Sequence, residues 1–225
     1  MSVSRKLLLT AAILMLLAAG LGFGSFATFN AETDNAGNVF AHGTLVLSNT
    51  KQGASACLST GGGSTDTNVN PNCDQLFNLT VKKPGDSGTV NLTLKNVGSL
   101  DASSFMVFSP TCTPADASGE TYHGTGNPCS VVQVYVQQWS DSSFSTPLAC
   151  VYGGATGSTC NFSDTSKTLG NFAATYSSSA SGLSIGGLNA GSSAYFTIGV
   201  KSPSSTGNNQ QGRQATQNFD WYIAQ

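Results

Sequence analysis

The sequence has few charges and few histidines. Of its 225 residues, 9 are Lys or Arg, 11 are Asp or Glu and 2 are His. So little positive charge cannot neutralise a row of phosphates, which argues against nucleic acid and anionic membrane surfaces as partners. The histidines, His42 and His123, are not part of an H-E-x-x-H sequence, the pattern that holds a catalytic zinc ion. We therefore expect no nucleic-acid partner, no metal and no other cofactor.

Long apolar runs are also scarce, and the one that exists lies at the start. Two basic residues precede an apolar run at residues 7–21, which is followed by small residues and then a polar chain. This order predicts a secretory signal peptide at residues 1–27, cleaved after Ala27, or after Thr28 as a one-residue alternative. The competing interpretation is a retained membrane anchor, because residues 7–27 are about long enough to cross a bilayer.

The remaining chain is predicted to form one domain. Removal of 27 of the 225 residues leaves 198, which suits a single domain with a sizeable core, placed here at residues 39–225. Its 7 basic and 11 acidic residues give a net charge of −4, so Ser, Thr, Asn, Gln and Gly must cover most of the surface. We expect a secreted protein of the extracellular matrix or cell surface.

Six cysteines follow the predicted cleavage site: Cys57, Cys73, Cys112, Cys129, Cys150 and Cys160. An even number of cysteines in an exported chain indicates disulfides. We favour pairing in sequential order, 57–73, 112–129 and 150–160, because each pair brackets a loop rich in Gly, Ser or Asn and closes without long-range register. Each bridge would contribute roughly 3 kcal/mol in the chain-entropy account. A metal site is the alternative, but no pair has C-x-x-C spacing.

Short alternating or β-branched runs separated by turn residues predict an all-β fold. The predicted strands are Phe40–Ser48, Leu76–Val81, Thr89–Asn96, Ala102–Ser109, Val131–Trp139, Leu148–Tyr152, Leu169–Tyr176, Ala194–Lys201 and Ala215–Ile223. No helix is predicted after the signal peptide. Such strands, joined by polar loops, fit a two-sheet, jelly-roll-like β-sandwich with disulfide-bounded surface loops, or another Greek-key sandwich.

No convincing set of catalytic residues is present. Gly182–Gly186 matches G-x-S-x-G, but no helical pattern follows it and no His–Asp partners can be assigned. Glu120 lies shortly before His123, but the surrounding glycines and proline argue against a helix that would direct both at one metal. We predict that the protein is not an enzyme.

The segment between the cleavage site and the domain, residues 28–38, suggests a mechanism. It opens with Thr28, Phe29, Asn30, Ala31, Glu32 and Thr33, which alternate between two sides and have no turn partner nearby. Such a segment is a disordered tail, an edge strand of its own domain, or a donor strand that enters an open groove of another copy. A head-to-tail contact of the third kind grows a filament. The residues alone leave these three fates open.

Four short passages of the sequence point to a family resemblance. They are Gly24–Asn35 (GSFATFNAETDN), Phe40–Leu45 (FAHGTL), Lys83–Asp86 (KPGD) with Lys95–Leu100 (KNVGSL), and Asn208–Gly212 (NNQQG) with the closing Phe219–Gln225. In this order they resemble four elements of the TasA/camelysin family of exported biofilm-matrix proteins: the signal-peptide exit, F-A-x-G-T-L, K-P-G-D with N-x-G-S-L, and N-x-x-Q-G with a closing aromatic strand. The six cysteines and the sparse charge depart from the lysine-rich, cysteine-free pattern of that family.

The resemblance implies a jelly-roll domain, processing by a SipW-like signal peptidase, and fibres in which the N-terminal strand of one subunit completes the sandwich of the next. Phe29 and Ala31 would be the inserted side chains. We therefore expect a structural subunit of an extracellular fibre or biofilm matrix. Its partners would be other copies of itself, the signal peptidase, and accessory matrix proteins or polysaccharide.

Two alternatives to a fibre subunit remain. One is a monomeric, secreted, glycan- or surface-binding β-sandwich, in which Tyr122, Trp139, Tyr152 and Trp221 would form a stacking platform, although aromatic residues in strands more often belong to a core. The other is a camelysin-like metalloprotease, which the family itself suggests.

Overall fold

The computed structural model describes residues 3–22, 41–63, 68–78 and 83–225. The chain divides into two compact units, Met1–Ala41 and His42–Gln225. The first contains α1 (Val3–Gly22), a run rich in Leu and Ala, which are strong helix formers. No helix within the described residues is long and apolar enough to span a membrane. The predicted cleavage residues and the predicted donor segment, residues 28–38, lie outside the described residues.

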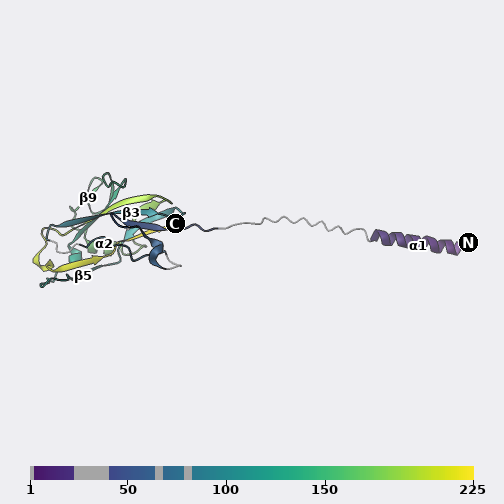
Figure 1. The fold of residues 1–225 in the computed structure, drawn as a ribbon, viewed down its shortest axis with the longest axis horizontal. Coiled ribbons are helices and arrows are strands. Elements are labelled where there is room, and N and C mark those ends of the chain that lie inside the picture. Colours follow the sequence, from purple (N-terminus) through teal and green to yellow (C-terminus); the bar gives the residue numbers. More distant parts are fainter. Residues whose placement is uncertain (1–2, 23–40, 64–67, 79–82) are drawn as a thin grey trace. The chain divides into compact units, whose positions relative to one another are not determined.

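The second unit is mostly β-structure, as expected. Its largest sheet has the antiparallel order β2 (Cys57–Leu58), β1 (Leu47–Lys51), β3 (Ser87–Asn96), β11 (Ser193–Lys201), β6 (Gln133–Trp139) and β7 (Pro147–Tyr152). A second sheet has the order β10 (Leu183–Leu188), β4 (Ala102–Phe108) and β13 (Asp220–Ala224). Two short sheets pair β12 (Arg213–Gln217) with β5 (Cys112–Asp116), and β8 (Gly154–Thr156) with β9 (Thr159–Asn161). Figure 1 shows β3 and β5 in separate layers of this unit.

The core lies between the six-stranded and the three-stranded sheet. Alternate residues of the central strands face inward, which is the period of a sheet with one buried face. The fully buried side chains include Leu92, Leu94, Val134, Val136, Phe196 and Ile198 from the first sheet, and Phe105 and Val107 from the second. The rings of Phe105 and Phe196 meet edge to face at 5.8 Å between centroids, which joins the two sheets. The sheets are therefore arranged like a β-sandwich.

The strand pair β5–β12 continues the pair β4–β13 as one bent ribbon. β4 leads directly into β5, and β12 leads directly into β13. The register runs from Gln217 opposite Cys112 to Asp220 opposite Phe108, so the partner strands have different numbers of residues between these two pairs. Such an irregularity interrupts the ladder and bends it. For this reason the predicted strand Ala215–Ile223 is wrong as one element and is split into β12 and β13.

One predicted strand is a helix. Leu169–Tyr176 forms α2 (Leu169–Thr175), and Thr168 caps it by accepting a hydrogen bond from the Asn171 N–H at 3.2 Å. Leu169, Phe172 and Ala173 are buried, a helical spacing that the expectation of no helix after the signal overlooked. Packing of Phe172 against the rings of Tyr152, Tyr176 and Phe219 fixes this helix in the core.

Other boundaries also differ from the prediction. The strand expected at Phe40–Ser48 begins only at Leu47 and continues to Lys51. Of the strand expected at Leu76–Val81, residues 76–78 are not a strand and the rest lies outside the described residues. The 3₁₀ helices η1 (Ser59–Gly62), η2 (Pro128–Ser130) and η3 (Asn208–Gln210) and the strands β2, β5, β8, β9 and β10 were not predicted.

The expected disulfides are confirmed. Cys57 pairs with Cys73, Cys112 with Cys129, and Cys150 with Cys160, so all six cysteines are used. The third bridge ties β7 to β9, and therefore holds the β8–β9 hairpin against the large sheet.

Candidate functional site

The free edge of the three-stranded sheet is the first candidate site. β13 pairs with β4 from Asp220 opposite Phe108 to Ala224 opposite Ser104. Within the parts of the chain that the structure describes, no strand pairs with the other side of β13, which ends the sheet. An unpaired edge presents N–H and C=O groups that can bind a further extended segment.

Apolar side chains beside this edge are only partly buried. In β4, Phe105 and Val107 are 1% and 0% exposed. In β13, Trp221 and Ile223 pack against the same core but are only partly buried. The neighbouring strand β10 shows the same difference, since its Leu183 and Ile185 are also partly buried. The inward side chains of β4 are thus fully buried, while those of its two neighbours, β13 and β10, remain partly exposed to solvent.

Buried polar atoms without hydrogen-bond partners lie on β13 and on β12, the strand that precedes it. In the described part of the chain, both amide atoms of Gln217 and the Nε1 of Trp221 are buried and have no hydrogen-bond partner. Each such group costs about 1–3 kcal/mol, so a native structure seldom keeps several together without a reason. Asp220 lies between them in sequence, and burial raises the pKa of its carboxyl. An added strand would bring donors and acceptors to this region.

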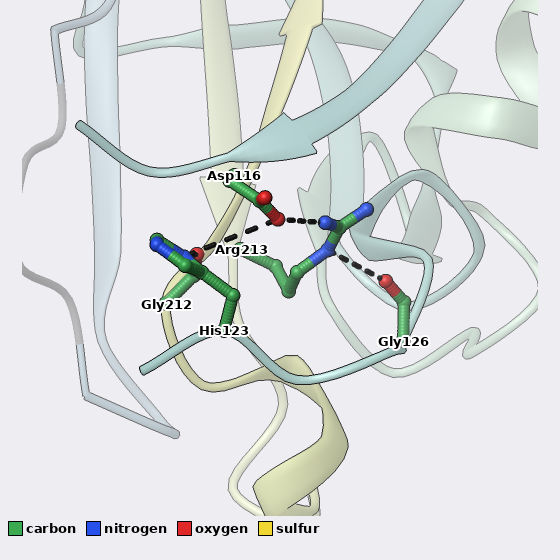
Figure 2. Close-up of polar contacts among 5 residues, drawn as sticks. All are labelled: Asp116, His123, Gly126, Gly212 and Arg213. Carbon is green, nitrogen blue, oxygen red and sulfur yellow. Dashed lines mark hydrogen bonds and ion pairs between the residues drawn. The ribbon is translucent and has the colours of Figure 1, made fainter. Parts of the chain in front are cut away.

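A charged cluster on the β5–β12 ribbon is the second candidate. The Arg213 guanidinium forms an ion pair with Asp116 on the facing strand, and its Nε donates to the Gly126 carbonyl at 3.1 Å. The Nδ1 of His123 lies 2.7 Å from the Gly212 carbonyl and 3.9 Å from Asp116. Figure 2 shows the carboxylate of Asp116 between the histidine and the arginine.

The contacts of this cluster indicate a structural clamp. A carbonyl oxygen only accepts, so the short contact with Gly212 requires a proton on Nδ1 of His123. The bonds to Gly126 and Gly212 tie the loop closed by the Cys112–Cys129 bridge to the segment before β12. Gly212 has φ +64°, and a Cβ there would collide with the Tyr122 carbonyl. No group of three or more metal-ligating side chains occurs among the residues described.

The G-x-S-x-G match does not form a nucleophile site. Ser184 lies within β10, opposite Met106 of β4, and the strand continues to Leu188. A nucleophile elbow needs a sharp turn from a strand into a helix, and this segment is an antiparallel strand instead. The match therefore reflects the abundance of Gly and Ser.

The four aromatic residues of the glycan alternative lie in different surroundings. Tyr122 is 60% exposed on a loop, and Trp139 is half-buried on β6. Tyr152 is buried, and desolvation, followed by the charges of Tyr176 and Asp164, raises its pKa to about 12. Trp221 packs against the rings of Phe105 and Phe196. Of the four, Tyr152 is therefore a core residue, Trp221 packs against the core while partly exposed, and Trp139 alone lies on an outer sheet face.

Comparisons with known proteins give no assignment. No protein-family model matches the chain, and no curated protein matches it either.

Proposed function

We propose that the processed chain is the structural subunit of an extracellular fibre or biofilm matrix, and that it polymerises by donor-strand complementation. In this proposal residues 28–33 of one copy add to the free side of β13 in the next copy. The single observation that carries it is the β13 edge. In the described part of the chain, β13 has no partner on the side away from β4, its apolar side chains are only partly buried, and buried polar atoms of Gln217 and Trp221 have no hydrogen-bond partner.

The lengths and side chains of the two segments are compatible. β13 has five residues and the donor has six, so each spans roughly 17–20 Å as an extended strand. Phe29, Ala31 and Thr33 share one side of the donor, which can cover the apolar surface beside Trp221. Pairing also removes an exposed sheet edge, and because the contact is head to tail its natural product is a filament.

Export and family membership are part of the same proposal. The order of charge and apolar residues before residue 28 supports a signal peptide, and three disulfides are typical of extracellular proteins. The resemblance to the TasA/camelysin family supports a jelly-roll connectivity for the sandwich. The fragments N-x-G-S-L and N-x-x-Q-G each end or precede a strand here: Asn96 ends β3, and Gly212 precedes β12.

Deletion of residues 28–33 from the processed chain tests the proposal. The full processed chain is expected to sediment as polymers and to show filaments by negative-stain microscopy, whereas the deletion variant is expected to remain a soluble monomer with three disulfides. Filaments from the deletion variant would exclude donor-strand assembly.

Two substitutions test which side of the donor is buried. Phe29→Asp is expected to weaken polymerisation more than Glu32→Ala, because a charge would replace the aromatic side chain that enters the neighbouring subunit. Equal effects would show that the donor uses its other side.

A synthetic peptide of residues 28–38 separates exchange between copies from pairing within one copy. Added to the deletion variant, it is expected to bind and raise the melting temperature without making filaments. A processed chain that stays monomeric at every concentration, with this segment protected from proteolysis, would show that the segment fills the edge of its own domain.

A further inference from the structure

We propose that the outer face of the six-stranded sheet binds a neutral polysaccharide. Two rows of side chains cross this face, on the side away from the core. The first row is Thr50, Thr93, Tyr195 and Trp139, and the second is Gln52, Asn91, Thr197 and Gln137. We call these eight residues the outer rows. They are hydroxyl, amide and aromatic side chains, and none is charged.

A chain of hydrogen bonds holds the outer rows in place. The Nε1 of Trp139 donates to Thr197 Oγ1 at 2.7 Å, and Thr197 Oγ1 donates to Asn91 Oδ1 at 2.5 Å. The Nδ2 of Asn91 then donates to Gln52 Oε1 at 2.9 Å. The indole of Trp139 can only donate, so the direction of every bond is fixed. The chain ends at the exposed amide nitrogen of Gln52, which remains available as a donor to a ligand.

Aromatic rings cluster at the β6 end of the first row. Trp139 and Tyr195 are directly opposite on neighbouring strands, and both are partly exposed. Phe144, from the loop between β6 and β7, meets the Tyr195 ring edge to face at 6.1 Å. Three aromatic side chains from two strands and one loop therefore gather on a face whose other members are small and polar.

The loop is built to hold Phe144 in this position. Its φ of +54° is the only positive φ of a non-glycine residue in the described part of the chain, and such a conformation is retained only when the surroundings impose it. Asp141 fixes the turn by accepting from the Ser143 N–H at 2.8 Å and from the Ser140 hydroxyl at 3.1 Å. Hydrogen bonds from the Ser143 side chain and then its backbone lower the pKa of Asp141.

The β8–β9 hairpin covers the part of this face around Gln137, which limits the area open to a ligand. Gln137 is 2% exposed because the β8–β9 hairpin covers it, and its Oε1 accepts from the Cys160 N–H at 2.6 Å. Beyond it the Tyr135 ring packs at a tilt against Phe162, with 4.9 Å between the ring centroids, and lies against Gly199. The part of the face left open is thus the strip from Gln52 to Trp139, in which Thr197 is itself only 6% exposed and serves to orient its neighbours.

The chemistry of this strip favours a neutral glycan over other occupants. Sugar rings present C–H groups that stack on aromatic rings and hydroxyls that pair with amides and hydroxyls, and the outer rows supply both. The outer rows themselves contain no charged partner for phosphates or uronates; the nearest charge on β3 is the exposed Lys95, a single cation outside the rows. The fixed hydrogen bonds reduce the ordering that binding would require. A fibre subunit with such a face would attach matrix polysaccharide along its length, which goes beyond the proposed polymerisation.

Binding to defined glycans tests this assignment. The probes are cellohexaose, chitohexaose, maltohexaose and mannan, with polygalacturonate as an anionic comparison, titrated into the deletion variant that lacks residues 28–33 and into the full processed chain. At least one neutral probe is expected to bind both proteins and to change the fluorescence of Trp139. Tyr195→Ala is expected to weaken that binding about tenfold, the loss of one stacking ring. Tyr122→Ala removes an exposed aromatic residue of the loop closed by the Cys112–Cys129 bridge, outside the strands of this sheet, and is expected to leave the binding unchanged.

A second variant keeps the test valid if Tyr195→Ala fails to fold. Trp139→Phe retains a ring but removes the indole donor, so it should fold and bind more weakly because Thr197 and Asn91 lose their fixed orientation. No binding of any neutral probe would overturn the proposal, as would equal binding by Tyr195→Ala. Loss of filaments without a change in glycan binding in Tyr195→Ala would show that the face is a contact between subunits instead. Because the deletion variant cannot exchange strands, failure of glycan binding and failure of polymerisation are observed separately.

Discussion

Replacement of Gln217 by leucine provides the sharpest test of the acceptor edge. Both amide atoms of Gln217 are buried without a partner in the described part of the chain, next to the strand that we propose pairs with the donor. One unsatisfied buried group costs about 1–3 kcal/mol. Leucine has similar size and no polar atom, so Gln217→Leu should raise the free energy of unfolding of the isolated domain by about 1–2 kcal/mol. For a chain of this length that corresponds to a melting temperature higher by roughly 2–8 °C.

The same substitution should weaken polymerisation. If the donor strand supplies the missing hydrogen bonds of the amide, leucine removes them, and the polymer loses about 1–2 kcal/mol per contact, roughly a tenfold weaker association. Thermal unfolding by circular dichroism in the variant without residues 28–33 measures the first effect. Sedimentation of the full processed chain measures the second. Gln214→Leu is the matched control, because Gln214 lies on the same strand but is exposed.

Two outcomes would refute this reasoning. A less stable domain would mean that the Gln217 amide already has a partner within the folded chain. A more stable domain that polymerises as well as the unchanged protein would mean that β12 and β13 are not the acceptor.

Three further predictions concern Gln137 of the outer rows, Gly212 beside the charged cluster, and Asp220 of β13. Gln137→Ala should lower the free energy of unfolding by about 3 kcal/mol, because the Cys160 N–H loses its acceptor and the carbonyls of Ala149 and Ser158 lose their donor; urea unfolding measures this. Gly212→Ala should destabilise by about 2–4 kcal/mol, combining the cost of φ +64° with the collision at Tyr122. Burial raises the pKa of the Asp220 carboxyl in the folded state. Ionisation of this carboxyl therefore lowers the free energy of unfolding at a pH above the folded-state pKa, and this loss disappears as the pH falls below the pKa of the unfolded state. Asp220→Asn should therefore stabilise the domain at pH 7 and not at low pH.

Each of these has a control. Gln214→Ala should be nearly neutral, and an equal loss would show that the buried amide has no special role. Gly157 has φ +61° but open space around it, so Gly157→Ala measures the backbone cost alone, and an equal cost at Gly212 would exclude the collision. A stability gain from Asp220→Asn that persists at low pH would show that ionisation is not its cause.

Local sequence patterns were sufficient to predict the central strands. Thr89–Asn96, Ala102–Ser109 and Ala194–Lys201 were predicted within two residues of β3, β4 and β11, since each alternates apolar and polar residues along one half-buried face. The disulfides were also predictable, because short loops between cysteines close without knowledge of the sheet order.

The β13 edge and the outer rows could be recognised only in the tertiary structure. The outer rows combine residues from β1, the residue after it, β3, β11 and β6, which are far apart in sequence and meet only through the register of the sheet. For that reason Tyr195 and Phe144 were not singled out, while Tyr152, which was suggested for a surface, is buried, and Trp221 packs against the core.

The sequence by itself determined the class of this protein: an all-β, disulfide-bonded chain with little charge, in which period-2 alternation and cysteine spacing are local properties. Among the residues that the structure describes, the tertiary structure decided which sheet edge is left unpaired and which amide is buried without a partner. These depend on contacts between distant segments, because strand order and burial are set when the sheets pack together, and no window of sequence contains that information.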